Sequence, residues 1–133
     1  MTLTFSWRGA FTSAEVSALH AHCFSAPGEA DWWARVQAHS LGWVVARDGA
    51  ALAGFVNVAW DGGEHAFILD TMVAEPHRRV GAGTRLVALA AEEARATGCR
   101  WLHVDFEPRL AKFYLESCGF TPTPAGVVSL VLP

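Results

Sequence analysis

Apolar positions along the chain follow two different periods, and the changes of period predict a mixed α/β fold. Apolar residues recur at every second position in a strand and at intervals of three and four in a helix. From the N-terminus, this pattern predicts one strand and two helices, over residues 3–7, about 13–24 and 32–39. Thr12 or Ser13 is expected to cap the first helix and Asp31 the second. The Ala26-Pro27-Gly28 sequence is expected to end the first helix.

The middle of the chain predicts an antiparallel meander. Three apolar runs follow one another closely, over residues 42–47, 52–60 and 64–73. Asp48-Gly49 separates the first two runs, and Asp61-Gly62-Gly63 separates the second from the third. Both are short turn sequences of the kind that join antiparallel neighbours.

The type of connection changes after the meander. A helix is predicted over residues 81–97, with Gly98 as its C-terminal cap, and a strand over residues 101–106. A strand-helix-strand crossover makes the two strands parallel. A final helix over residues 110–118 and an almost wholly apolar strand over residues 127–132 complete the pattern. Such a strand is either central in the sheet or paired with a partner chain, and the second arrangement would give a homodimer.

Composition limits the classes to which the protein can belong. Its 133 residues fit one domain, and 52% hydrophobic against 17% charged residues indicates a compact core rather than disorder. The net charge of −3 provides no basic surface for nucleic acid. Residues 2–10 lack the pattern of a signal peptide, and no apolar run reaches the roughly 18 residues of a membrane span. A cytoplasmic protein without membrane contact is therefore expected.

The cysteines indicate neither a metal site nor a nucleophile. Cys23, Cys99 and Cys118 are odd in number, widely spaced and contain no C-x-x-C pair. We interpret them as reduced thiols of the core, and no bound metal is expected.

The segment from Arg78 to Thr84 carries the clearest chemical signal. Its sequence, RRVGAGT, lies between the apolar run 67–73 and the predicted helix 81–97. The first N–H groups of a helix have no partner within it, and the helix dipole adds positive charge at the same end. Glycines let the main chain approach a ligand closely. A strand, a glycine-rich turn and a helix start, in this order, predict a site for a phosphate-bearing ligand.

Two common phosphate motifs do not fit this segment. A P-loop requires a lysine before its Ser or Thr, but Thr84 follows Gly83 directly. A dinucleotide fingerprint requires a third glycine where this chain has Leu86. The pattern that remains is R-x-x-G-x-G, on Arg78, Gly81 and Gly83.

In its context, this pattern resembles the central motif of the GNAT acyltransferase superfamily. There, [QR]-x-x-G-x-[GA] lies between a strand and a long helix, and an aromatic-tyrosine pair precedes a Gly-Phe, here Phe113-Tyr114 and Gly119-Phe120. The resemblance extends over residues 66–120. It implies an α/β fold in which an antiparallel meander is followed by a parallel βαβ pair. The parallel strands, here residues 64–73 and 101–106, would part in a V-shaped slot that holds coenzyme A.

The resemblance also implies which residues bind the co-substrate, acetyl-coenzyme A. In the family, amides of the motif grip the pyrophosphate, which implies this role for Arg79, Val80, Gly81, Ala82, Gly83 and Thr84. The main chain of Met72 and Val73 is expected to pair with the pantetheine arm. Arg78 is expected to help hold the phosphates, with a solvated loop arginine as the alternative. The amide near Val73 is the expected donor to the oxyanion.

Tyr114, the only tyrosine of the chain, is the expected catalytic acid. In the family, the corresponding tyrosine protonates or orients the sulfur of coenzyme A, and a phenol has a suitable strength for this. Four residues separate Tyr114 from Gly119-Phe120, whereas the common form has three. One extra residue turns a helix face by about 100°. Either a bulge in the helix absorbs it, or the phenol points elsewhere and Tyr114 is a core aromatic.

The residue that takes a proton from the amine is less closely defined. Asp70 is the first candidate, because a carboxylate within an apolar strand must be paired, hydrated or functional. It is expected on the same strand face as Ile68 and Met72, and a structural hydrogen bond is the alternative role. Other candidates are His65, Asp105, Glu107 and water.

The sequence thus predicts an acetyl-coenzyme A-dependent N-acetyltransferase. The acetyl group would pass directly to an amine of a small molecule or peptide, without a covalent enzyme intermediate. An acyl-coenzyme A-binding sensor without turnover is the alternative. A nucleotide-binding regulator is a third hypothesis, against which the missing P-loop lysine argues.

Overall fold

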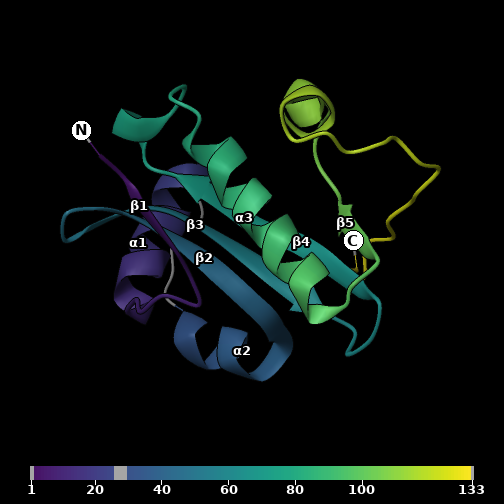
Figure 1. The fold of residues 1–133 in the computed structure, drawn as a ribbon, viewed down its shortest axis with the longest axis horizontal. Coiled ribbons are helices and arrows are strands. Elements are labelled where there is room, and N and C mark those ends of the chain that lie inside the picture. The colour runs from purple at the N-terminus through teal and green to yellow at the C-terminus, as the bar shows by residue number, and fades with distance from the viewer. Residues whose placement is uncertain (1, 26–29, 133) are drawn as a thin grey trace.

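The computed structural model describes residues 2–25 and 30–132 and contains one five-stranded sheet in the order β1-β2-β3-β4-β5 (Figure 1). The first four strands pair antiparallel, and β4 pairs with β5 in parallel. The strands are β1 Thr4–Trp7, β2 Ser40–Asp48, β3 Ala51–Trp60, β4 His65–Val73 and β5 Trp101–Val104. The predicted meander and the parallel crossover are therefore confirmed.

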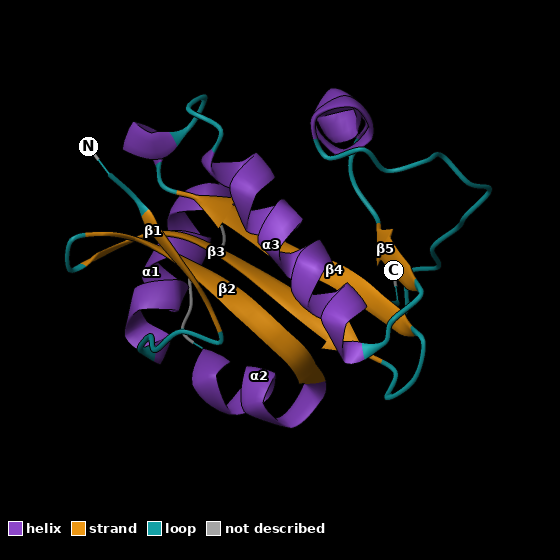
Figure 2. Cartoon of the chain, viewed as in Figure 1, coloured by secondary structure: helices purple, strands orange, loops and turns teal. Residues whose placement is uncertain are grey.

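The helices cover both faces of the sheet. They are α1 Ser13–Phe24, α2 Trp32–His39 and α3 Ala82–Thr97. Helix α3 crosses one face, and α1 and α2 pack on the other (Figure 2). Alternate residues of the central strands enter two separate apolar clusters, so that Val44 of β2 packs on the α3 side and Trp43 on the side of α1 and α2. Burial on both faces explains why the central strands are apolar at nearly every position.

The helix starts follow from their caps. Thr12 Oγ1 accepts from the Glu15 amide and Glu15 accepts from the Thr12 amide, which makes a capping box at the start of α1. Asp31 caps α2 through the Ala34 amide. Helix α1 ends at Phe24, but the Ala26-Pro27-Gly28 stop predicted for it lies outside the described residues. None of the described helices is long and apolar enough to cross a membrane.

Strands β4 and β5 separate partway along their length. Their parallel pairing runs from His65 opposite Trp101 to Ile68 opposite Val104 and then stops. Strand β4 continues to Val73, whereas β5 ends two residues before its predicted limit. The second half of β4 is therefore left without a neighbour on this side, which is the expected V-shaped opening.

The predicted last strand is wrong. Residues 119–130 have no regular secondary structure, and none of residues 119–132 pairs with the sheet. The apolar side chains of residues 127–132 are 77–88% exposed. The high strand propensity of residues 127–132 was not sufficient to make them a strand. A strand forms only where another strand is available for pairing and where one face can be buried. Strand β5 is consequently an edge of the sheet.

Candidate active site

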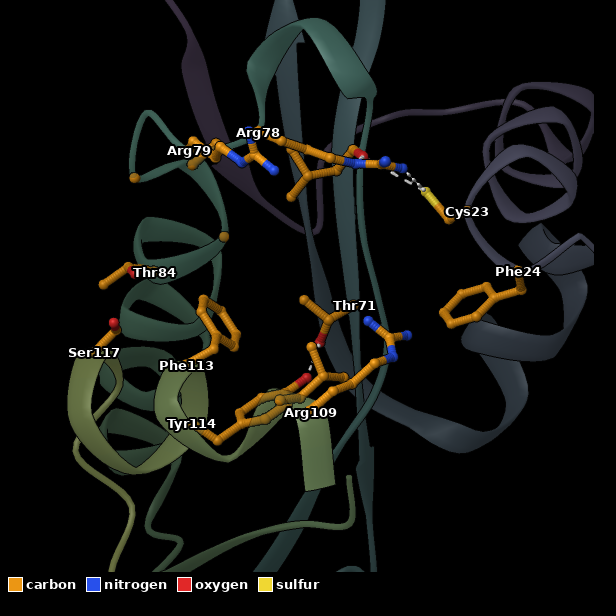
Figure 3. A pocket seen from close by; sticks show the side chains of 15 residues that line it. Cys23, Phe24, Thr71, Arg78, Arg79, Thr84, Arg109, Phe113, Tyr114 and Ser117 are labelled. Carbon is orange, nitrogen blue, oxygen red and sulfur yellow. Dashed lines mark hydrogen bonds between the residues drawn. The ribbon is translucent and has the colours of Figure 1, made fainter. Parts of the chain in front are cut away.

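A pocket of about 620 Å³ opens where β4 and β5 separate (Figure 3). Its walls come from four parts of the chain that are distant in sequence. They are the end of α1, the second half of β4, the start of α3 and the helical segment after β5. The slot implied by the topology is thus a cavity bounded by side chains.

The start of α3 gives the pocket an anion-binding end. Gly81 is the N-cap in a left-handed conformation with φ of 83°, and no side chain caps the helix within the described residues. The first helical bond is donated by the Arg85 amide to the Gly81 carbonyl, over 3.1 Å. The amides of Ala82, Gly83 and Thr84 precede this bond and belong to the unpaired N–H groups of a helix start. All three residues line the pocket, where the helix dipole also favours an anion.

Gly83 also joins α3 to the segment after β5. A Cβ built on Gly83 would lie 3.1 Å from the Phe113 ring, which is closer than ordinary van der Waals contact. The absence of a side chain here lets Phe113 pack against the first turn of α3. Gly83 therefore contributes an unpaired amide to the pocket and also makes room for Phe113 in the pocket wall.

Arg78 crosses the upper end of the pocket (Figure 3). Its Nε donates to the Val73 carbonyl over 2.9 Å, and its Nη2 lies 3.5 Å from Cys23 Sγ. The Cys23 thiol also donates to the Val73 carbonyl over 3.5 Å. This carbonyl, expected to meet the pantetheine arm, thus has two partners within the protein. Arg79 lines the pocket beside Arg78, with φ of 66°.

The extra residue after Tyr114 is absorbed by a change of helix type. The segment after β5 consists of a 3-10 turn, Pro108–Leu110, and a π-helix, Lys112–Ser117. A π-helix takes one residue more per bond, and here the Cys118 amide donates to the Phe113 carbonyl over 2.9 Å. The bulge considered from the sequence is therefore present, and it leaves the Tyr114 side chain in the pocket wall.

Tyr114 is 6% exposed and donates a hydrogen bond to Thr71 Oγ1 over 3.2 Å. Its ring stacks on Phe106 at 5.1 Å and meets the edges of Phe113 and Phe120. Burial raises the pKa of the Tyr114 phenol above its usual 10.0, although the bond to Thr71 acts in the opposite direction. The phenol is therefore protonated at neutral pH and available as a proton donor.

Asp70 lies at an irregularity of β4. The register between β3 and β4 shifts between Phe55 and Asn57, and Asp70 has φ of 57°. The predicted strand parity is wrong for this reason, since Ile68 packs in the α3 cluster and Met72 in the cluster on the opposite face. Asp70 does not line the pocket, although it directly precedes Thr71, which does.

The Asp70 carboxylate lies at the end of a short series of hydrogen-bonded side chains. Asn57, 4% exposed, donates through Nδ2 to Asp70 Oδ2 over 3.3 Å. Ser40 in turn donates to the Asn57 side-chain oxygen. The carboxylate is thus held in place one residue away from the partner of Tyr114. Its role as base stays a prediction.

The other base candidates, His65, Asp105 and Glu107, do not line the pocket. His65 Nδ1 and His103 Nε2 are 2.8 Å apart on the paired part of β4 and β5, outside the pocket. Asp105 is exposed after the end of β5. Glu107 accepts from Arg109 Nε over 3.0 Å. Arg109 and Leu110, whose amide donates to the Glu107 carbonyl over 2.8 Å, both line the pocket.

The structure brings most of the predicted cofactor residues together. Those that line the pocket are Val73, Arg78, Arg79, Gly81, Ala82, Gly83 and Thr84. Met72 does not, because its side chain is 1% exposed within the core. Val80 is 69% exposed and borders a smaller depression with Arg85, whose guanidinium stacks on Phe5 at 4.0 Å.

Seven residues of the pocket were not predicted from the sequence as parts of the site. They are Cys23, Phe24, Thr71, Arg109, Leu110, Phe113 and Ser117. Thr71 carried a signal that was available, because it is a second polar residue in an apolar strand. Phe24 and Arg109 carried none, since only the folded chain brings the end of α1 and the turn after β5 to the same opening.

Burial makes two of the three thiols, Cys99 and Cys118, weaker acids. Burial raises the pKa of Cys118 to about 11 and raises that of Cys99 to a smaller extent, with Asp61 adding to the latter. All three cysteines are unpaired. Among the described residues, no group of His, Cys, Asp and Glu is arranged to hold a metal ion.

The family model described as the acetyltransferase (GNAT) family matches residues 6–120. The chain belongs to this family. The glycine-rich turn at α3, the opening between β4 and β5 and the buried tyrosine all lie within the matched region. A search of curated proteins found no match.

Solved GNAT structures share the fold of this chain. A Trypanosoma brucei acetyltransferase has a TM-score of 0.81 at 17% identity, over 98% of this chain and 100% of that one. A glucosamine-6-phosphate N-acetyltransferase from Arabidopsis thaliana has 0.75 at 18% identity, over 95% and 97%. An aminoglycoside N-acetyltransferase in complex with CoA has 0.74 at 14% identity, over 96% and 93%. Membership of the family supports acyl transfer as the class of reaction.

Proposed function

We propose that this GNAT protein is an acetyl-coenzyme A-dependent N-acetyltransferase that transfers the acetyl group directly to a small-molecule or peptide amine. One observation carries the proposal. The free amides at the start of α3 and the protonated hydroxyl of Tyr114 lie in the same pocket. The first group suits a diphosphate and the second suits a departing thiolate, and acetyl-coenzyme A contains both. A cytoplasmic location goes with this proposal.

Donor binding would use the main chain at one end of the pocket. The amides of Ala82, Gly83 and Thr84 face an anion without competition from a capping side chain within the described residues. The guanidinium of Arg79 adds positive charge at the same end. The unpaired second half of β4 offers main-chain groups to an extended arm that carries amides. The pocket thus has the polarity that a phosphorylated, amide-containing donor requires.

The amine must be neutral before it can attack the thioester. An alkyl amine with an ordinary pKa is only about 0.1% neutral at pH 7, so a nearby proton acceptor increases the reactive fraction. Asp70, held by Asn57 next to Thr71, is the candidate, directly or through a water molecule. The amine nitrogen then forms a bond to the acetyl carbonyl carbon, and the amide near Val73 is the candidate donor to the oxyanion.

The intermediate collapses when the carbon–sulfur bond breaks. The electron pair goes to sulfur, and the Tyr114 hydroxyl, which lines the pocket, is the candidate donor of a proton to that sulfur. Thr71, which already accepts a bond from this hydroxyl, fixes the direction of the phenol. The products are the N-acetylated amine and free coenzyme A.

The experiment incubates the protein with acetyl-coenzyme A and a panel of primary amines and follows release of the coenzyme A thiol. Turnover with at least one amine, lowered strongly by Tyr114→Phe, supports the enzyme. Calorimetric binding of acetyl-coenzyme A without turnover on any amine would instead favour a sensor module. A protein that neither binds acetyl-coenzyme A nor releases thiol would contradict the proposal.

A further inference from the structure

One of the three arginines that line the pocket lies away from the start of α3. The pocket lining contains Arg78, Arg79 and Arg109, and no carboxylate lines it within the described residues. Arg78 and Arg79 lie at the α3 end (Figure 3). Arg109 lies at the other end, beside Thr71 and Tyr114. The third arginine therefore stands where the acyl group is transferred, and not where the diphosphate binds.

The local structure directs Arg109 into this end of the pocket. It belongs to the 3-10 turn Pro108–Leu110, which follows β5 after residues 105–107. Its Nε donates to Glu107 over 3.0 Å, which leaves the fork of two terminal nitrogens without a partner among the described residues. Figure 3 shows this fork on the side that faces Phe24. The guanidinium is thus oriented by one bond and has its bidentate edge available.

A guanidinium at this position selects the charge of the acceptor. Glu107 balances part of its charge, so the directed N–H groups of the fork, more than net charge, favour an anionic group over a second ammonium group on the acceptor. The guanidinium attracts a carboxylate, which it can bind through two parallel N–H···O bonds. An acceptor that carries a carboxylate near its amine satisfies Arg109 while the amine reaches the Thr71–Tyr114 pair.

The remaining surface at this end is apolar. Phe24, the last residue of α1, is 47% exposed and lines the pocket, and Leu110 lines it next to Arg109. The exposed Phe24 ring provides an apolar contact, and the two terminal nitrogens of Arg109, whose Nε is paired with Glu107, provide an anion contact. An α-amino acid with an apolar side chain has both complementary groups, together with the amine.

We infer that the acceptor is an α-amino acid with an apolar side chain, whose carboxylate is bound by Arg109 and whose side chain packs on Phe24. This inference rests on the proposed N-acetyltransferase function and names its substrate class. The amine nitrogen forms a bond to the acetyl carbon, the carbon–sulfur bond breaks, and the amine proton leaves through the base while sulfur takes one from Tyr114. The carboxylate of the amino acid takes no part in the bond changes.

The test uses two acceptors that differ only in the carboxylate, L-phenylalanine and phenethylamine. With acetyl-coenzyme A, kcat/KM for L-phenylalanine should exceed that for phenethylamine by roughly 10- to 100-fold, the usual effect of a charge-assisted hydrogen bond. Arg109→Gln should remove this preference by raising KM for the amino acid, with phenethylamine little changed. Arg109→Lys should restore part of it. Arg95→Gln, an exposed arginine on α3, is the matched control and should keep the preference.

Binding measurements keep the inference testable apart from turnover. N-acetyl-L-phenylalanine should bind the coenzyme A-loaded protein more tightly than N-acetylphenethylamine, and Arg109→Gln should abolish the difference. Affinity for coenzyme A itself should not change in that variant. Equal affinity for the two products would overturn the inference. So would loss of coenzyme A affinity in Arg109→Gln, because Arg109 would then serve the donor.

Two further outcomes separate the inference from the proposed function. An Arg109-dependent preference for succinyl-coenzyme A over acetyl-coenzyme A with phenethylamine would place the carboxylate on the acyl group and overturn the assignment to the acceptor. Turnover of phenethylamine that matches or exceeds that of L-phenylalanine would also overturn the assignment to the acceptor. The proposed N-acetyltransferase function would still stand in that case. Absence of turnover on every amine would contradict the proposed function, while the two binding arms would still decide whether Arg109 recognises a carboxylate.

Discussion

Tyr114 donates a hydrogen bond to Thr71 over 3.2 Å, and this bond joins the π-helix to β4 at the point where β5 has ended. The pair closes the lower side of the pocket and holds the phenol toward its interior (Figure 3). A buried proton donor is thus fixed by one neighbouring hydroxyl.

The single tyrosine makes its protonation directly measurable. Because burial raises the pKa of Tyr114, the tyrosinate absorbance of the folded protein should appear above pH 10, the ordinary midpoint. Thr71→Val removes the partner that lowers this pKa and should move the midpoint further up. Denatured protein, in which the phenol is exposed, is the control. A midpoint at or below 10 in the folded protein would contradict the structural assignment.

Removal of the phenol oxygen should affect turnover more than binding. General acid catalysis contributes roughly 100- to 10,000-fold, so Tyr114→Phe should lower kcat by at least about 100-fold at near-constant affinity for coenzyme A. Thr71→Val leaves the proton donor in place and should lower kcat by only about 10-fold, the effect of a misdirected group. The measurement is thiol release under saturating donor. Equal kcat for wild type and Tyr114→Phe would show that another group protonates the sulfur.

The conformation of Gly81 should be required for donor binding. Its φ of 83° is strained for any residue with a Cβ, and Gly81→Ala should cost about 1–2 kcal/mol of stability and distort the amides that follow. Gly49, in the β2–β3 turn, has φ of 60° and also has open space around it. Gly49→Ala is therefore a matched control that should destabilise the protein similarly.

The two glycine variants should differ in affinity for coenzyme A. Calorimetry should show a Kd about 10-fold weaker in Gly81→Ala and unchanged in Gly49→Ala. Equal affinities in the two variants would indicate that the diphosphate does not bind at the start of α3.

The sequence was sufficient to predict the elements that have local causes. The sequence predicted Thr12 or Ser13 as the cap of α1, and the structure has Thr12, while the Asp48-Gly49 turn predicted the first hairpin. The glycine-rich turn located one end of the pocket because its amides belong to contiguous residues, and its binding of a phosphate stays a prediction. Such features depend on a few residues that are adjacent in the chain, so they can be recognised from the sequence.

The parts that failed depend on contacts between distant segments. The β-bulge at Asp70 shifts one strand against its neighbour, so the parity read from β4 alone gave the wrong face. Arg109 and Phe24 meet at one opening only after folding, and neither lies in a motif. The π-helix shows the intermediate case. The spacing between Tyr114 and Gly119 signalled an irregularity, but only the packing of Tyr114 decided how it was absorbed.

The Glu15–Arg47 pair should make stability depend on pH in acid. The Arg47 guanidinium beside Glu15 lowers the pKa of that carboxyl from 4.5 to about 2. A folded-state pKa below the unfolded value gives stability that is complete above about pH 4.5 and is lost as the pH falls toward 2. The loss should be about 1–2 kcal/mol after allowance for solvent screening at this partly exposed pair.

Glu15→Gln tests this pair without breaking the helix start. Glutamine can keep the capping box with Thr12, so only the charge is removed. Denaturant unfolding between pH 5 and pH 2 should show a shallower decline in the free energy of unfolding than in wild type. Glu92→Gln, on the exposed side of α3, is the matched control and should stay within about 0.5 kcal/mol of wild type. Parallel declines in Glu15→Gln and wild type would rule out the pair as the cause.

The exposed C-terminal segment should be covered by a second copy of the chain. Residues 127–132 present five apolar side chains that are 77–88% exposed, and β5 offers an unpaired edge with Trp101 59% exposed beside it. Exposed apolar side chains and an unpaired strand edge are both features that favour association between chains. We expect a dimer that dissociates on dilution, measured by sedimentation. Leu130→Lys should shift the protein to monomer, whereas Ser129→Lys, in the same segment at a polar position, should shift it less. A monomer at all concentrations, with wild-type turnover, would show that the segment needs no partner.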